Sequence, residues 1–76
     1  MSATPMSHAH VQLVKADGTT INLESVEYFG GSGMIWLRGQ NFEQGSIVEV
    51  FIDGDPHTVK AIENKEQFCE IRLERE

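Results

Sequence analysis

Hydrophobic and polar residues alternate in short segments along most of this 76-residue chain, and turn-forming residues separate the segments. A period of two residues is typical of β-strands with one buried face, and no segment shows the period near 3.6 of an amphipathic helix. We therefore expect six short strands, at residues 11–15, 19–23, 34–37, 47–53, 57–62 and 67–73. This pattern predicts an all-β fold, either a small six-stranded antiparallel barrel or a β-sandwich.

The first two segments predict a β-hairpin. The dipeptide Asp17-Gly18 lies between them, and Asp-Gly favours two-residue type I′ turns because both central residues of such a turn have positive φ. After Leu23 the apolar positions change from odd to even, beginning at Val26. A one-residue slip would turn every following side chain to the other face of the sheet, so we expect a β-bulge or bend near Ser25.

Five of the seven glycines lie between residues 30 and 45, around an apolar run, Met34–Leu37, that contains the only tryptophan. Glycines beside a strand are typical of sharp corners, and a run that is apolar on both faces is typical of a central strand or a barrel corner. The segment Gly30–Gly33 lacks the Lys-Ser/Thr pair and the following helix of known phosphate-binding fingerprints. If a small ligand binds in this region, the candidate residues are Gly31, Ser32 and Arg38.

Large apolar side chains on outward faces form the candidate interaction surface. In the fourth segment the even positions, which begin at Val48, are all apolar and are expected to face the core, which turns Ile47 and Phe51 outward. Phe68 is likewise expected to face outward, and Trp36 is the best binding anchor if its ring is not fully buried. Because a contiguous apolar patch marks an interaction surface, the candidate protein interface consists of Trp36, Ile47, Phe51 and Phe68.

The sequence shows none of the residue sets that catalysis usually needs, such as a nucleophile with a base or paired carboxylates in a shielded pocket. Cys69 lies in an alternating apolar segment, where a free cysteine is commonly a small buried hydrophobic residue. His57 follows a turn and is expected to be solvated, and the pair Asp53 and Asp55 has too few ligands for calcium. We expect no enzymatic activity, no cofactor and no metal site.

The charge and hydropathy of the sequence argue against nucleic-acid and membrane partners. Twelve acidic residues against six basic ones give a formal net charge of −6, whereas nucleic-acid affinity rests largely on Lys and Arg contacts to phosphates. No apolar run approaches the roughly 20 residues of a membrane helix, and the first residues do not form a secretory signal. With a single cysteine, an internal disulfide is not possible. We expect a cytoplasmic protein without a nucleic-acid or membrane partner.

Chain length allows one domain. Residues 1–9 are small, polar and contain proline, so we expect them to form a flexible arm, with residues 10–76 as a single small β domain. Domains of this size usually rely on disulfides, a metal or a partner subunit for stability. Since neither of the first two is expected here, the length favours a homo-oligomer.

Two stretches carry a likeness to a known family. Residues 26–34 are spaced like an Asp-x-Ser-x-x-Gly segment, with Tyr28 and Gly30 in place of the Asp and Ser, and residues 45–50 are similar to a Gly-x-x-Val strand start. Over residues 11–74 the chain thus resembles a PilZ domain, the small six-stranded barrel of bacterial signalling and type IV pilus proteins. Typical members bind cyclic di-GMP through an Arg-x-x-x-Arg segment ahead of the first strand, and this chain has no arginine before Arg38. The resemblance implies a variant that does not bind this nucleotide and works through protein contacts.

A second likeness covers residues 25–73. The segment Ile35–Phe42 ends in a Gly-x-Asn-Phe turn that is similar to IPT/TIG domains, which are immunoglobulin-like β-sandwiches of surface, phage and transcription-factor proteins. This resemblance implies a structural module with two packed sheets. The hairpin at Asp17-Gly18 has no counterpart in that pattern, so we favour the PilZ-like barrel.

Together these features predict a non-enzymatic bacterial β-barrel module that binds a protein partner or itself. One alternative is a regulator that binds a small, nucleotide-like ligand near residues 30–38. The other is an immunoglobulin-like structural unit of a surface or phage protein. A closed barrel is the expected outcome for the first hypothesis, and two packed open sheets for the last.

Overall fold

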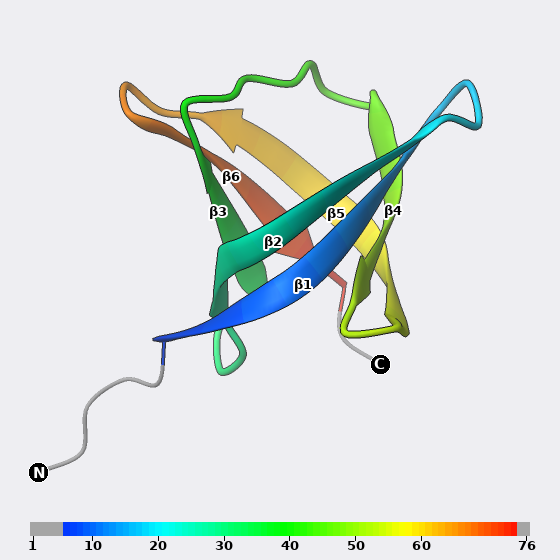
Figure 1. Ribbon diagram of the computed structural model, residues 1–76. Helices are drawn as coiled ribbons and strands as arrows, with labels where there is room; N and C mark the ends of the chain where they lie inside the picture. The colour runs from blue at the N-terminus through cyan, green and yellow to red at the C-terminus, as the bar shows by residue number, and fades with distance from the viewer. Residues whose placement is uncertain (1–5, 75–76) are drawn as a thin grey trace, which may run out of the picture.

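The computed structural model describes residues 6–74, which form a closed antiparallel barrel of six strands (Figure 1). The strands are β1 (Met6–Lys15), β2 (Thr20–Phe29), β3 (Met34–Arg38), β4 (Ile47–Ile52), β5 (Asp55–Asn64) and β6 (Phe68–Leu73). Around the barrel their order is β1-β2-β3-β6-β5-β4. The predicted six-stranded barrel is therefore confirmed, and the two-sheet sandwich is not formed.

Strand β1 begins earlier than the sequence pattern predicts. Residues 6–9, assigned to a flexible arm, pair with the end of β2, from Met6 opposite Phe29 to Ala9 opposite Val26. The reason is that Ala9 continues the inward alternation of β1 and is buried in the core. The arm boundary at residue 9 is thus wrong for residues 6–9, and residues 1–5 lie outside the described part of the chain.

The two Asp-Gly dipeptides form different turns. Between β1 and β2 only Gly18 has positive φ, and Lys15 and Thr19 close a three-residue loop through a 2.8 Å backbone hydrogen bond. Asp17 keeps negative φ because its carboxylate accepts hydrogen bonds from the backbone N–H and the hydroxyl of Thr19, at 3.0 and 2.6 Å. The type I′ turn predicted here is therefore wrong, and it is replaced by a type I turn followed by a glycine bulge.

A type I′ turn does occur at the second dipeptide. Asp53 and Gly54 both have positive φ, at 50° and 92°, and they are the whole loop between the paired residues Ile52 and Asp55. Asp53 also accepts a hydrogen bond from the N–H of His10 and donates its own N–H to the carbonyl of His10. The turn between β4 and β5 is thereby fastened to β1.

The predicted bulge at Ser25 is confirmed. The pairing of β2 with β1 changes by one residue between Leu23 and Val26, and Ser25 has a φ of 58°. One extra residue in β2 returns Val26 to the inward face, where it is buried. The change of apolar positions from odd to even after Leu23 therefore indicated this bulge.

A second bulge, in β4, overturns two predicted orientations. Val14 pairs with Glu49 and Lys15 with Ile47, so Val48 is the extra residue. As a result Ile47 faces the core with 1% of its surface exposed, while Val48 is 47% exposed. The prediction that Ile47 belongs to the outward interface is wrong, because the bulge shifts the alternation of β4 before Val50.

The barrel interior is filled by aliphatic side chains from all six strands, together with Cys69. Burial by these neighbours raises the pKa of the Cys69 thiol, which favours its neutral form. The predicted burial of Cys69 is confirmed, and Ile71 and Leu73 of β6 are buried with it.

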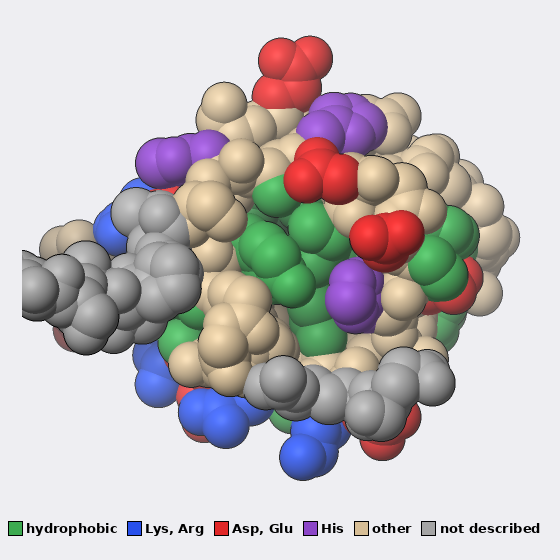
Figure 2. All heavy atoms as spheres, turned by 90° about the horizontal axis from the view of Figure 1, so that it is seen from below, with side chains coloured by type: hydrophobic (Ala, Val, Ile, Leu, Met, Phe, Trp, Pro, Cys, Tyr) green, Lys and Arg blue, Asp and Glu red, His purple; other side chains and the backbone are tan. Residues whose placement is uncertain are grey.

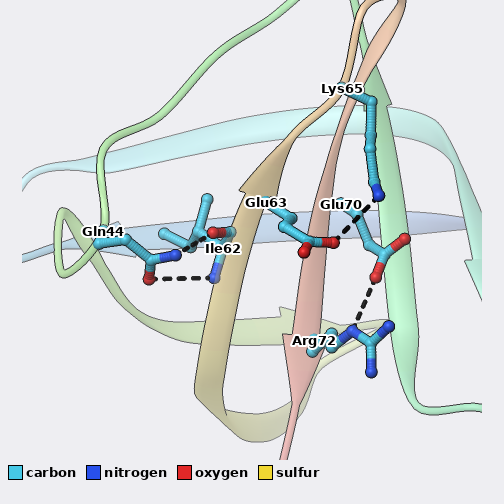
Figure 3. Close-up of polar contacts among 6 residues, drawn as sticks. All are labelled: Gln44, Ile62, Glu63, Lys65, Glu70 and Arg72. Carbon is cyan, nitrogen blue, oxygen red and sulfur yellow. Dashed lines mark hydrogen bonds and ion pairs between the residues drawn. The ribbon is translucent and has the colours of Figure 1, made fainter.

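The glycine-rich connection from β3 to β4 crosses one end of the barrel (Figure 1). The side chain of Gln44 in this connection pairs with the backbone of Ile62 in β5, as a neighbouring strand would. Gln44 Nε2 donates to the carbonyl of Ile62, and the N–H of Ile62 donates to Gln44 Oε1 at 3.3 Å (Figure 3). The side-chain amide of Asn64 makes a similar pair of bonds with the backbone of Phe42, at 2.8 and 3.1 Å. Phe42 packs against the core, and the connection is a corner that closes the barrel.

Candidate protein interface on the outer face of β2, β3 and β6

Strand β3 has two different faces. Ile35 and Leu37 point into the core and are buried, whereas Trp36 lies on the outer surface of the barrel and is half-buried. In register, Trp36 lies opposite Glu27 of β2 on one side and Glu70 of β6 on the other. The only tryptophan is therefore placed at the centre of a three-stranded outer surface.

Three aromatic rings form a diagonal across these strands, which we call the aromatic row: Phe29 of β2, Trp36 of β3 and Phe68 of β6. The ring centroids of Phe29 and Trp36 are 4.6 Å apart with a 48° tilt, and those of Trp36 and Phe68 are 4.2 Å apart in a stacked arrangement. Diagonal neighbours on adjacent strands lie within reach of aromatic side chains, and such ring pairs add about 0.5–1.5 kcal/mol beyond their buried area. The row is therefore a firmly positioned apolar surface.

Arg38 borders the aromatic row at one end. Its guanidinium carbon lies 5.9 Å from the ring centroid of Trp36 and 5.8 Å from that of Phe68. The same guanidinium donates two hydrogen bonds to the Glu27 carboxylate, at 2.7 and 3.2 Å. These bonds lower the pKa of Glu27 and raise that of Arg38, so both groups are charged at neutral pH.

Two further ion pairs neutralise charge on the same side of the barrel (Figure 3). Glu70, only 6% exposed, accepts a 2.7 Å hydrogen bond from Arg72 Nε, and the ammonium group of Lys65 lies 3.1 Å from Glu63. The interaction with Glu70 also raises the pKa of Arg72. Each of these carboxylates thus has a cation beside it, and the aromatic row lies in locally balanced charge although the whole chain carries −6.

The indole N–H of Trp36 has no hydrogen-bond acceptor among the described residues, although its nitrogen is buried. A buried donor without an acceptor costs about 1–3 kcal/mol. The position of Trp36 is therefore not explained by polar contacts, and it depends on the stacking of the row.

A groove of about 200 Å³ continues from the aromatic row toward the start of β2. It lies where β2 and β3 diverge, and its apolar lining comes from Leu23 and Val26 of β2 and from Leu37 and Trp36 of β3. Arg38 and Gln40 also line it. The aromatic row and this groove make one continuous surface.

The remaining predicted interface residues do not all join this surface. Phe68 does, as part of the aromatic row. Phe51 is half-buried on β4, where it pairs with Gln12 of β1 and Pro56 of β5, and β4 adjoins neither β3 nor β6. Phe29 was missed by the sequence reasoning. Its signal was the four-residue loop Gly30–Gly33, which places Phe29 opposite Met34 and hence diagonal to Trp36.

The three candidate ligand-binding residues are not brought together. Arg38 ends β3, whereas Gly31 and Ser32 lie in the turn before β3, at the other end of that strand. This turn borders a recess of about 490 Å³ at the lower mouth of the barrel. Figure 2 looks into that mouth, where hydrophobic side chains form the floor and acidic and histidine side chains lie around it.

The recess is lined on several strands by polar groups. They include Tyr28, His57 and the two carboxylates of Glu49 and Glu74, with Leu73 as an apolar contact. His57 was expected to be solvated, and it is instead half-buried at this mouth. Among the described residues, no Lys or Arg lines the recess.

Within residues 6–74, no group of three or more His, Cys, Asp or Glu side chains is arranged to hold a metal ion. The described part of the chain also contains no helix that is long and apolar enough to cross a membrane. Comparison with known proteins found no matching family model, no matching curated protein and no matching solved structure.

Proposed function

We propose that this protein is a non-enzymatic β-barrel module that binds a protein partner through the aromatic row and the adjoining groove. The observation that carries the proposal is the stack of Phe29, Trp36 and Phe68 on the outside of the barrel, where it contributes nothing to the interior core. The stack stabilises the pairing of β2, β3 and β6, and its half-buried rings leave part of their surface for a partner.

The composition of this surface supports the proposal. Protein interfaces are enriched in aromatic residues and arginine, and binding energy concentrates in Trp, Tyr and Arg side chains near their centre. Trp36 has this central place, with Arg38 beside it. The neighbouring carboxylates are already neutralised by ion pairs, which lowers the electrostatic cost of covering the surface.

The proposal extends to the class of protein. We place the chain beside PilZ-like barrels of bacterial cytoplasmic proteins, as a variant that acts through protein contacts without cyclic di-GMP. Its barrel architecture is compatible with that class, and Arg38, the arginine within the glycine-rich segment, is held in an ion pair with Glu27.

Site-specific photo-cross-linking in cells that naturally contain the protein tests this proposal. A photoreactive benzoylphenylalanine replaces Phe68 in one variant and Phe51 in a matched control on the opposite side of the barrel. We expect an adduct of defined mass from position 68 and none from position 51. Trp36→Ala should then weaken capture about 30-fold or more, as expected for loss of an interface hot spot worth about 2 kcal/mol. Equal capture at both positions would overturn the proposal.

The recess at the barrel mouth favours a second candidate function, the binding of a small ligand. Its volume suits a small organic molecule, and the carboxylates of Glu49 and Glu74 select a cation over a nucleotide. Titration with benzylamine and, separately, with cyclic di-GMP tests this idea by amide chemical shifts. Shifts at Tyr28 and His57 with benzylamine alone would support it, and no shifts with either compound would reject it.

A further inference from the structure

Strand β2 has an open edge over its first half. Strand β3 pairs with it only from Glu27 to Phe29. Residues 20–25 of β2 have β1 on one side and, among the described residues, no strand on the other. In Figure 1 the first half of β2 runs away from β3.

The hydrogen bonds between β1 and β2 determine which backbone N–H and C=O groups of β2 point toward the open edge. The bond from Lys15 N–H to the Thr19 carbonyl shows that odd-numbered residues of β2 bond to β1 before the bulge. In an antiparallel ladder the alternate residues point their N–H and C=O groups the other way. The backbone groups of Thr20 and Asn22 therefore face the open edge, as donors and acceptors for an added strand.

The aliphatic side chains beside this edge leave apolar surface that an added strand could cover. Ile21 and Leu23 are only partly buried against the core, and the groove next to Leu23 continues to Trp36. Natural proteins protect exposed edges with Lys, Pro or bulges. Here residues 20–24 are Thr-Ile-Asn-Leu-Glu, and only the bulge at Ser25 limits the edge.

We propose that the partner binds by adding an extended segment, with alternating apolar and basic side chains, to the open edge of β2. This inference rests on the proposed function and names its binding mode. The unpaired backbone groups call for an extended strand, and the half-buried aliphatic side chains call for apolar residues on one face of it. Its apolar side chains contact Ile21, Leu23 and the groove, and its end reaches Trp36.

The negative charge of the protein favours a basic segment as the added strand. The whole chain carries −6, and Glu24 on this edge has no ion-pair partner among the described residues, whereas Glu27 is held by Arg38. A basic strand gains from this field during association. A second copy of the chain would bring the same negative charge to the edge, which disfavours pairing of β2 with itself.

The probe is a synthetic peptide of alternating Lys and Val, seven residues long and capped at both ends. Its controls are the Glu-Val peptide and a Lys-Val peptide N-methylated on alternate residues, which keeps the charge but blocks the backbone donors. Binding is measured by isothermal titration at physiological salt. We expect the Lys-Val peptide to bind and both controls to bind at least about 10-fold more weakly, since several hydrogen bonds or favourable charges are lost. Equal affinity for the N-methylated peptide would overturn the proposal.

Variants of the protein test the same contact from the other side. Asn22→Pro removes the N–H that faces the edge and leaves the bonds to β1, so it should weaken peptide binding roughly 3- to 10-fold, whereas Asn22→Ala should change it less than about 2-fold. Glu24→Lys should weaken binding, and Asp55→Lys, at the turn between β4 and β5, is the matched charge control. If the chain forms a dimer that Asn22→Pro dissociates, the occupant is a second copy and the proposal is wrong.

Failure of this inference is distinguishable from failure of the proposed function. If the cross-link from position 68 survives Asn22→Pro and depends on Trp36, the aromatic row binds a partner without strand addition. If the Lys-Val peptide binds and depends on Asn22, yet Trp36→Ala has no effect, the edge binds a strand and the aromatic row is not its anchor.

Discussion

Replacement of Ile47 by alanine is the sharpest test of the bulge in β4. The alternating pattern of the sequence predicts that Ile47 faces outward and Val48 inward, whereas the structure places Ile47 in the core at 1% exposure and Val48 outside at 47%. Truncation of a buried isoleucine to alanine costs about 2–5 kcal/mol, which combines lost transfer free energy with the cavity left behind. Truncation of the exposed Val48 should cost about 0.5 kcal/mol.

These magnitudes are large compared with the whole stability of the domain. At roughly 0.05–0.15 kcal/mol per residue, a chain of this length has a free energy of unfolding of about 4–11 kcal/mol. A loss of about 3 kcal/mol lowers the Tm by about 12–24 °C in a domain of this size. Ile47→Val, which removes one methylene group, should cost about 0.5–1.5 kcal/mol and keeps the comparison measurable if Ile47→Ala does not fold.

The assay is urea unfolding followed by the fluorescence of Trp36, with the same protocol for Ile47→Ala, Ile47→Val and Val48→Ala. We expect the midpoints to fall in the order Val48→Ala, Ile47→Val, Ile47→Ala, with the last the least stable. If Val48→Ala destabilised the protein as much as Ile47→Ala, β4 would alternate without a bulge and the reasoning would be refuted.

Three further outcomes are expected. Gln44→Ala should cost about 1–2 kcal/mol in urea unfolding, because it leaves a backbone N–H and C=O of β5 without partners, whereas Glu43→Ala in the same connection should be neutral. The thiol of Cys69 should react with a disulfide reagent only as fast as the protein unfolds, since it is buried and its pKa is raised; rapid native-state labelling would contradict this. The pKa of Glu27 is lowered in the folded state, mainly by its hydrogen bonds from Arg38, so its contribution to stability is present above the ordinary carboxyl pKa and is lost as the pH falls through the lowered value. Glu27→Gln should therefore reduce the loss of stability on acidification, and an unchanged acid profile would argue against this pair.

The strand pattern was predictable because period-two alternation is a local property of the chain. It indicated the six strands and the bulge at Ser25, where the apolar positions change from odd to even, but it left a barrel and a sandwich open, and the PilZ-like resemblance favoured the barrel. It did not indicate the bulge in β4, because Ile47 and Val48 are both apolar and either one satisfies the pattern. The turn at Asp17 was mispredicted for a related reason, since its outcome depends on a side-chain hydrogen bond to Thr19 that the dipeptide alone does not specify.

The candidate interface was predictable only in part. Phe68 could be named because it lies outside the inward alternation of its strand, and Trp36 because it is the only tryptophan and a binding anchor if its ring is not fully buried. Their contact depends on the pairing of β3 with β6, which are separated by 29 residues in the chain. Local periodicity does not indicate the order of strands in a sheet. Phe51 has the same local pattern as Phe68, and the barrel order alone separates the two residues.

The open edge of β2 and the aromatic row have a common origin in the length of β3. With only five residues, β3 covers β2 as far as Glu27 and then turns away at Gly39, so the first half of β2 is left without a neighbour on that side. The same short strand pairs along its whole length with β6, which brings Trp36 against Phe68. A longer β3 would cover the edge and fill the groove beside it. The open edge of β2 and the aromatic row are therefore adjacent because β3 is short. A partner strand on β2 meets the aromatic row without any rearrangement of the barrel.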